Sequence, residues 1–207
     1  NWYYFNWLCG DHICEQHIHN LDVANWFLNE YPETAQGMGG REIRKDKKFG
    51  EIFDHHYVEF KYKSGAIVSS QCRHQPNTHR QVNETIIGTK GVLEISGNGN
   101  AIIKNHNGDT LFQYNQRGDE SPYQIEHNEL FKSIRNGGYI NDGENGAKAT
   151  LTSIMGRMAT YTGKVVEWEN AMNADDNMIP KYLSWNSNPP TLPDSNGYYK
   201  IPKPGSS

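Results

Sequence analysis

The stretch HYVEFKYKSGAIVSSQC, residues 56–72, decides the fold class of this 207-residue chain. Polar and apolar residues alternate over residues 56–63 and again over residues 66–72. That period of two is typical of a strand with one buried face. Ser64-Gly65 stands between the two runs and is a turn signal. The stretch therefore predicts a β-hairpin.

Similar signals on either side of this hairpin predict further short strands. Gly-rich turns such as Gly88-Thr-Lys-Gly91 separate several of them, so neighbouring strands should run antiparallel. The predicted strands are residues 34–38, 81–87, 92–95, 101–104, 110–114 and 164–168. Apolar residues at helical spacing predict helices over residues 123–135 and 144–161. Residues 12–30 are predicted to form a third helix, with Asp11 as its N-cap and Pro32 beyond its end.

A run of strands with helices towards the two ends indicates an α+β fold. We expect an open, mostly antiparallel sheet with helices on one face, in a single domain over residues 1–207. Residues 1–10 start in dense aromatic sequence without a Met, so we interpret them as a junction to a preceding domain. Residues 175–207 are Pro-rich and predict an extended tail, held to the surface by Trp185, Tyr198 and Tyr199.

Composition excludes several classes of partner. The formal net charge is −4, with both signs mixed along the chain, which argues against nucleic acid or a membrane surface as partner. No apolar run approaches the ~20 residues of a membrane span. The three cysteines are irregularly spaced, which fits neither a disulfide framework nor a zinc ribbon.

The segment from Gly10 to Trp26 carries the densest chemistry, with three histidines and three carboxylates. On a helix, Glu15, His19 and Asp22 (i, i+4, i+7) project from one face. An acid–imidazole–acid row of this kind predicts contact with a substrate or a metal. The loop Arg73-His74-Gln75, between a predicted strand and Pro76, and His55 before the hairpin are further candidates for substrate binding.

Several motifs in a fixed order carry a resemblance to a known family. The run Glu15-Gln-His-Ile-His19-Asn-Leu-Asp22 is similar to the motif Asp-x-Gly-x-His-x-x-Asp, which opens the C-terminal domain of the Gfo/Idh/MocA family (glucose–fructose oxidoreductase, inositol dehydrogenase and relatives). The resemblance continues over nearly the whole chain, through residues 50–56, 88–91, 126–137, 141–146, 156–164 and 192–199.

The resemblance implies an NAD(P)-dependent oxidoreductase acting on a sugar or polyol hydroxyl, with the fold of a glyceraldehyde-3-phosphate dehydrogenase C-terminal domain. This chain would be its substrate-binding and oligomerisation half, with its own N-terminal Rossmann domain and a second copy as partners. NAD or NADP is expected in the intact protein, in a bacterial cytoplasm or periplasm. Neither Gly-x-Gly-x-x-Gly nor Glu-Lys-Pro occurs here, so we expect no cofactor-binding residue and no activity from this chain alone.

The resemblance also implies roles for individual residues. His19 would be the acid–base that moves the hydroxyl proton. Glu15 stands where the family has aspartate, one methylene shorter, and would orient His19 or bind a substrate hydroxyl. Asp22 is the second carboxylate of the motif and would bind substrate, together with Arg73, His74, Gln75 and His55. His17 replaces the glycine of the motif.

Three alternative functions stay open at this point. A branch of the same family cleaves glycosidic bonds with bound NAD, and a domain without its cofactor half would be a carbohydrate-binding scaffold. A metal-dependent isomerase would use His12, Glu15 and His19 with His55 or His56. The spacing His-x-x-Glu-x-x-x-His is not a recognised metal motif, so we expect no metal.

Overall fold

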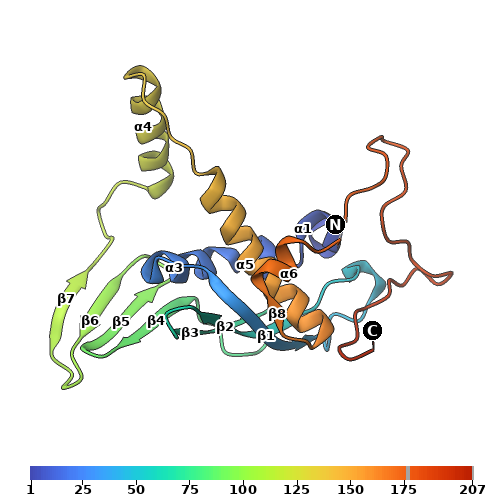
Figure 1. Cartoon of the computed structure of the whole chain (residues 1–207), viewed down its shortest axis with the longest axis horizontal. Coiled ribbons are helices and arrows are strands. Elements are labelled where there is room, and N and C mark those ends of the chain that lie inside the picture. Colours follow the sequence, from blue (N-terminus) through green and yellow to red (C-terminus); the bar gives the residue numbers. More distant parts are fainter. Residues whose placement is uncertain (176–177, 207) are drawn as a thin grey trace. The chain divides into compact units, whose positions relative to one another are not determined.

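The computed structural model describes residues 1–175 and 178–206 and has the α+β fold expected from the sequence (Figure 1). It consists of two compact units. The first unit contains Asn1–Thr78 and Ala147–Ser207, and the second contains His79–Gly146. Each unit holds one four-stranded sheet, whereas the sequence suggested a single open sheet. Residues 74–82 form the loop that connects β3 (Ile67–Arg73), the last strand of the first run, to β4 (Asn83–Gly88), the first strand of the second sheet.

The first unit has the strand order β3-β2-β1-β8, with antiparallel neighbours throughout. Its strands are β1 (Pro32–Gly40), β2 (His55–Tyr62), β3 (Ile67–Arg73) and β8 (Val166–Glu167). Its helices are α1 (Asn6–Cys9), α2 (His12–Glu15), α3 (Ile18–Leu28), α6 (Trp168–Met172) and α5 (Gly143–Thr162), which begins at the end of the second unit. Single 3-10 turns lie at Trp2–Tyr4 and Lys47–Phe49.

The predicted hairpin is confirmed as β2 and β3. Phe60 pairs with Val68, and Ser64-Gly65 forms the turn, with Gly65 at φ 88°. Alternate β2 residues are buried and point into the core. The core cluster combines residues of α2, α3, β1, β2, α5, β8 and α6 and contains Ile13, Leu21, Ala35, Val58, Phe60, Tyr62, Leu151, Met155, Ala159, Val166 and Ala171.

Small residues let α5 approach the sheet closely (Figure 1). A Cβ added at Gly156 would lie 2.9 Å from Ile13 Cδ1 and 3.0 Å from Phe60 Cζ. On the facing strand β1, Cβ atoms at Gly37 and Gly39 would lie 3.1 and 3.2 Å from side-chain atoms of Thr160. The glycines therefore set the helix–sheet distance, which in turn places Thr160 beside β2.

Replacing Gly156 with leucine is expected to lower the free energy of unfolding by about 1–3 kcal/mol, because the site has no room for a side chain. Gly146 lies in the same helix with nothing within 4 Å of an added Cβ. Gly146→Leu should therefore be neutral or stabilising by up to about 1 kcal/mol. Urea unfolding measures both variants, and equal stabilities would contradict the packing argument.

The second unit is an antiparallel meander with one helix. Its strands are β4 (Asn83–Gly88), β5 (Gly91–Ser96), β6 (Ala101–Lys104) and β7 (Thr110–Tyr114), in that order, followed by α4 (Pro122–Arg135). Cross-strand pairing aligns four apolar residues in one row, namely Ile86, Leu93, Ile103 and Phe112. None of the residues 79–146 is buried in the single chain.

Three local expectations need correction. The predicted helix over residues 12–30 is broken into α2 and α3, because the His12 carbonyl accepts hydrogen bonds from the amides of both Gln16 and His17. The last strand is shorter than predicted, since Trp168 already begins α6. Trp185 is fully exposed and does not hold the tail, whereas Tyr199 packs on Phe5 with ring centroids 5.2 Å apart.

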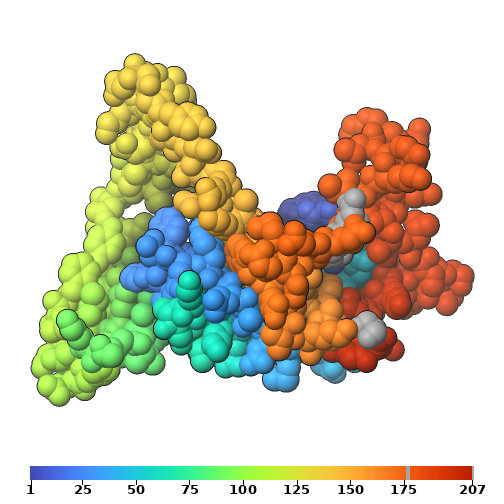
Figure 2. All heavy atoms as spheres, in the orientation of Figure 1, coloured from blue at the N-terminus to red at the C-terminus, as the bar shows by residue number. Residues whose placement is uncertain are grey.

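Residues 178–206 of the tail carry no helix or strand. They lie at the red end of the chain in Figure 2. Residues 176, 177 and 207 of the predicted tail lie outside the described residues. In the part of the chain that the structure describes, no helix has the length and apolar character needed to cross a membrane.

Candidate functional site

Asp11 lies at the centre of a buried polar cluster. Its carboxylate is fully buried, and Oδ2 accepts hydrogen bonds from the Phe53 amide (2.9 Å) and the Tyr161 hydroxyl (2.6 Å). Oδ1 accepts from the His12 amide at 2.5 Å, which confirms Asp11 as the N-cap of α2. The Asp11 backbone has φ 74° and ψ 162°, a region that normally only glycine adopts.

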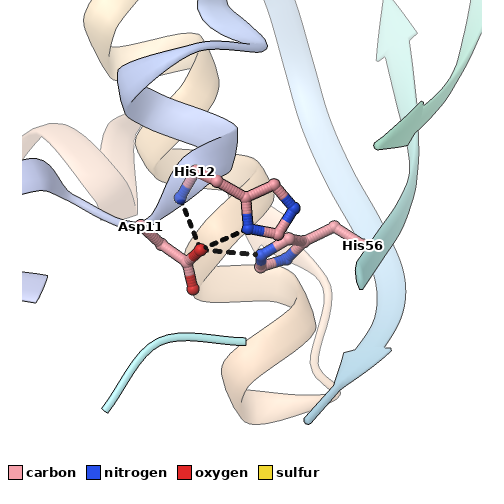
Figure 3. A group of neighbouring side chains, drawn as sticks. All are labelled: Asp11, His12 and His56. Carbon is pink, nitrogen blue, oxygen red and sulfur yellow. Dashed lines mark hydrogen bonds and ion pairs between the residues drawn. The ribbon is translucent and has the colours of Figure 1, made fainter. Parts of the chain in front are cut away.

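Two imidazoles face the same carboxylate oxygen (Figure 3). His12 Nδ1, from α2, lies 2.8 Å from Asp11 Oδ1, and His56 Nε2, from β2, lies 3.3 Å from it. The two rings are tilted, with centroids 4.7 Å apart. Among the described residues, both ring nitrogens of His12 and Nε2 of His56 are buried without a hydrogen-bond partner.

The cluster fixes the ionisation of its oxygen groups. Burial alone would raise the pKa of Asp11, but His56 and His12 hold the pKa of this carboxyl well below its usual range. Burial and the nearby Asp11 charge raise the pKa of Tyr161 well above its ordinary value. Asp11 is therefore an anion and Tyr161 a neutral hydroxyl donor over the whole neutral range.

Burial also sets the state of the nearby thiols. It raises the pKa of Cys14 to about 11 and that of Cys9 to about 12. Both are free cysteines. At neutral pH they are thiols, and they behave as small packing residues rather than nucleophiles.

A second polar group adjoins His12. The His74 and His12 ring centroids are 4.8 Å apart, and His74 Nε2 lies 2.8 Å from Gln16 Oε1. The Tyr3 hydroxyl donates to the same Gln16 oxygen at 2.8 Å. Glu15 precedes Gln16, and its Oε2 is buried with no hydrogen-bond partner among the described residues. Of the predicted site residues, His74 therefore contacts the side chain of Gln16, and Glu15 is the residue before Gln16 in the chain.

The other predicted substrate-binding residues lie at the open end of the β2–β3 hairpin. His55 Nδ1 lies 2.8 Å from Asp54 Oδ1, and Gln75 Nε2 is 3.4 Å from the same His55 nitrogen. Arg73 pairs with His55 across the two strands. Arg73, Gln75 and His55 therefore form a group of their own, beside His74 in the chain.

His19 and Asp22 lie on α3, separated from Glu15 by the break at residues 16 and 17. His19 is exposed and Asp22 is partly buried. Burial raises the pKa of Asp22, and the neighbouring His19 acts to lower it. The row Glu15, His19 and Asp22 is therefore not one continuous helix face, and the catalytic and binding roles of these residues stay predictions.

Sequence reasoning missed the cluster of Asp11, His12 and His56. Asp11 was predicted only as a helix cap, and His12 and His56 were considered as metal ligands only in a set that also contained Glu15 and His19. The three positions belong to a helix start and a strand 44 residues further on, and no spacing motif connects them. The one available signal was the acidic residue and histidine directly after Gly10.

His17 supplies a test of the burial around this site. Its Nε2 lies 2.7 Å from Ser70 Oγ, and burial, followed by the charges of His12 and His56, lowers its pKa to about 4. The folded state therefore resists protonation that the unfolded chain accepts near pH 6.5.

Unfolding free energy should fall as the pH is lowered from about 6.5 towards 4, because the unfolded chain binds the extra proton. His17 alone should contribute a loss of about 2 kcal/mol between pH 7.5 and pH 5. Urea unfolding of wild type and His17→Gln at both pH values measures this contribution. His74, whose pKa burial also lowers to about 4, should leave some acid sensitivity in both wild type and His17→Gln. If His17→Gln kept the full pH dependence of wild type, the contribution assigned to His17 would be contradicted.

Comparison with known proteins shows a match to one family model over the N-terminal part of the chain. Residues 1–94 match the family model of the GFO/IDH/MocA C-terminal domain. The match includes α2, α3, the hairpin and every residue of the polar clusters described above except Tyr161.

Solved structures share the fold of this chain. The aldose-aldose oxidoreductase of Caulobacter crescentus has 20% identity and a TM-score of 0.59, covering 72% of this chain and 45% of that one. The myo-inositol 2-dehydrogenase of Lactobacillus plantarum has 18% identity and a TM-score of 0.56, with coverages of 74% and 47%. An Agrobacterium radiobacter oxidoreductase, in complex with NAD⁺, L-tartaric acid and magnesium, has 16% identity and a TM-score of 0.54, with coverages of 74% and 48%.

The chain spans about half the length of these structures. No curated protein matches it.

Proposed function

We propose that this chain is a Gfo/Idh/MocA C-terminal domain and the substrate-binding half of an NAD(P)-dependent oxidoreductase that acts on a hydroxyl of a sugar or polyol. The observation that carries the proposal is the acid–histidine set at the start of the matched region. His74 contacts the side chain of Gln16, which follows Glu15 in the chain, and His19 is exposed on α3. Support comes from the relatives, which include an aldose oxidoreductase, an inositol dehydrogenase and an NAD⁺ complex.

In such a reaction the chain's own residues bind the substrate and move one proton. Oxidation of an alcohol removes the hydroxyl proton and a hydride from the adjacent carbon. His19, which is exposed, would accept the hydroxyl proton on a ring nitrogen. Asp22, Arg73, His74, Gln75 and His55 offer donors and acceptors for the remaining hydroxyls, and Glu15 would orient the reacting one. The sequence has no glycine-rich dinucleotide loop, so we assign none of its residues to the cofactor.

The test uses the intact protein that contains this domain. Aldoses and polyols are supplied with NAD⁺ or NADP⁺, and reduced nicotinamide is followed by absorbance. We expect reduction with at least one substrate and none from the 207-residue chain alone. NAD-dependent release of sugar from glycosides without net reduction would favour a glycosidase instead. Sugar binding without any turnover would favour a carbohydrate-binding scaffold, and both outcomes overturn the dehydrogenase proposal.

We also propose that the second unit pairs with a second copy of the chain through its sheet. The row Ile86, Leu93, Ile103 and Phe112 lies on one face of the sheet, yet none of these side chains is buried in the single chain. Of the four side chains, that of Phe112 is the most exposed, at 52%, and the other three are half-buried. Apolar area of this kind is typical of an obligate interface. A homodimer would cover it.

Replacing Phe112 with glutamate is therefore expected to convert a dimer into a monomer, because it places a charge in the centre of the apolar row. Gln113→Glu puts the same charge on the opposite face of β7 and should leave the dimer intact. Light scattering coupled to gel filtration gives the mass of each form. A monomeric wild-type protein would refute the pairing.

A further inference from the structure

The cluster of Asp11, His12 and His56 has no role in the proposed function. The three residues are 0%, 1% and 3% exposed, so their side chains are removed from water. One ligand atom from each lies within 4.8 Å of the other two. Figure 3 shows both rings directed at one carboxylate oxygen, His12 from α2 and His56 from β2.

Hydrogen bonding fixes which nitrogen of His56 carries a proton. The Thr160 hydroxyl donates its single hydrogen to the Arg157 carbonyl at 2.9 Å. At the same time Thr160 Oγ1 lies 2.9 Å from His56 Nδ1, so Nδ1 is the donor in that contact. In a neutral imidazole, Nε2 then carries a lone pair, and it faces Asp11 Oδ1 at 3.3 Å.

This arrangement brings a nitrogen lone pair and a carboxylate oxygen together in a buried space. A nitrogen lone pair and a carboxylate oxygen repel each other strongly where water is excluded. His12 adds two more buried nitrogens without a hydrogen-bond partner among the residues described. A cation between the three groups would turn this repulsion into attraction.

We propose that Asp11 Oδ1, His12 Nδ1 and His56 Nε2 bind one divalent transition-metal ion, with Zn²⁺ as the best match. Two imidazoles and a carboxylate form a ligand set typical of Zn²⁺. With bonds of about 2.0–2.2 Å in a tetrahedral arrangement, neighbouring ligand atoms are separated by about 3.3–3.6 Å. His56 Nε2 lies 3.3 Å from Oδ1, at the lower end of that range, and His12 Nδ1, at 2.8 Å, would move outward by about 0.5 Å on binding.

The surrounding residues supply the outer contacts that a metal site needs. Thr160 holds the His56 ring with Nε2 pointing inward, and the Phe53 amide and Tyr161 hydroxyl hold Oδ2, which leaves Oδ1 for the metal. Three protein ligands leave one or more positions for water or an oxygen ligand. The site differs from the set His12, Glu15 and His19 and revises the expectation of no metal. It does not depend on the dehydrogenase proposal.

Titration of the chelator-treated full chain with ZnCl₂ in a calorimeter tests the site. We expect one Zn²⁺ per chain, and a loss of affinity of at least about 100-fold in His56→Gln and in His12→Gln, since each removes one of three ligands. His55→Gln is the matched control, because the neighbouring residue on a strand points to the other face. It should bind Zn²⁺ like wild type.

A second measurement does not depend on the variants folding. Wild-type crystals soaked in ZnCl₂ should show an anomalous peak between Asp11 and the two histidines. Peaks only at exposed histidines, or His56→Gln binding Zn²⁺ as tightly as wild type, would overturn the proposal. So would NMR spectra showing that His56 Nε2 carries a proton when ZnCl₂ is present, because the cation beside Asp11 would then be that proton.

Discussion

Replacing His19 with asparagine in the intact protein is expected to lower kcat by about 10²–10⁴-fold and to change KM by less than about threefold. Asparagine keeps a polar side chain of similar reach, so it can still hydrogen-bond a substrate hydroxyl. It cannot accept a proton near neutral pH. The substitution should therefore slow only the proton-transfer step. Steady-state kinetics with the preferred substrate give kcat and KM for the variant and for wild type.

The pH profile separates this role from a structural one. In wild type, kcat/KM should fall on the acid side as the base becomes protonated, and His19→Asn should lose that limb. His127→Asn is the matched control, because His127 is also an exposed helical histidine but lies on α4 of the second unit. If His19→Asn had an unchanged kcat, or a change in KM alone, His19 would not be the residue that transfers the proton.

The fold could be predicted from the sequence wherever local pattern and tertiary contact agree. The hairpin of residues 56–72 is one case, because its alternation places Val58, Phe60 and Tyr62 on one face, and that face is buried. The strands Ala101–Lys104 and Thr110–Tyr114 have the predicted bounds, since Gly-containing turns delimit both. In these segments the turn chemistry alone determines the ends of the strands.

Prediction of the site was limited by contacts that no local pattern encodes. The break after α2 depends on a shared carbonyl at His12, and periodicity over residues 12–30 does not detect one inserted residue. The meeting of Asp11, His12 and His56 depends on how α2 packs against β2. The glycines Gly37 and Gly39 contribute to it, because they admit Thr160 of α5 close to β1.

The polar residues of the site are therefore supported by the packing of α5 against the sheet, and Phe60 lies at the centre of that packing. Its ring is fully buried in the core cluster, and its Cζ lies 3.0 Å from the position of a Cβ at Gly156. Across the sheet it pairs with Ala35 on β1 and Val68 on β3. Truncation here would open a cavity between two rigid elements that cannot easily collapse.

Phe60→Ala is accordingly expected to lower the free energy of unfolding by about 3–5 kcal/mol, through lost burial and the cavity left behind. Phe60→Leu keeps most of the volume and should lose a smaller amount, about 1–1.5 kcal/mol. Phe27→Ala on α3 is the matched control, because Phe27 is 52% exposed, and its loss should stay within about 0.5 kcal/mol. Urea unfolding with an unchanged m-value gives all three numbers. If Phe60→Ala and Phe27→Ala were equally stable, Phe60 would not be the residue that holds α5 against the sheet.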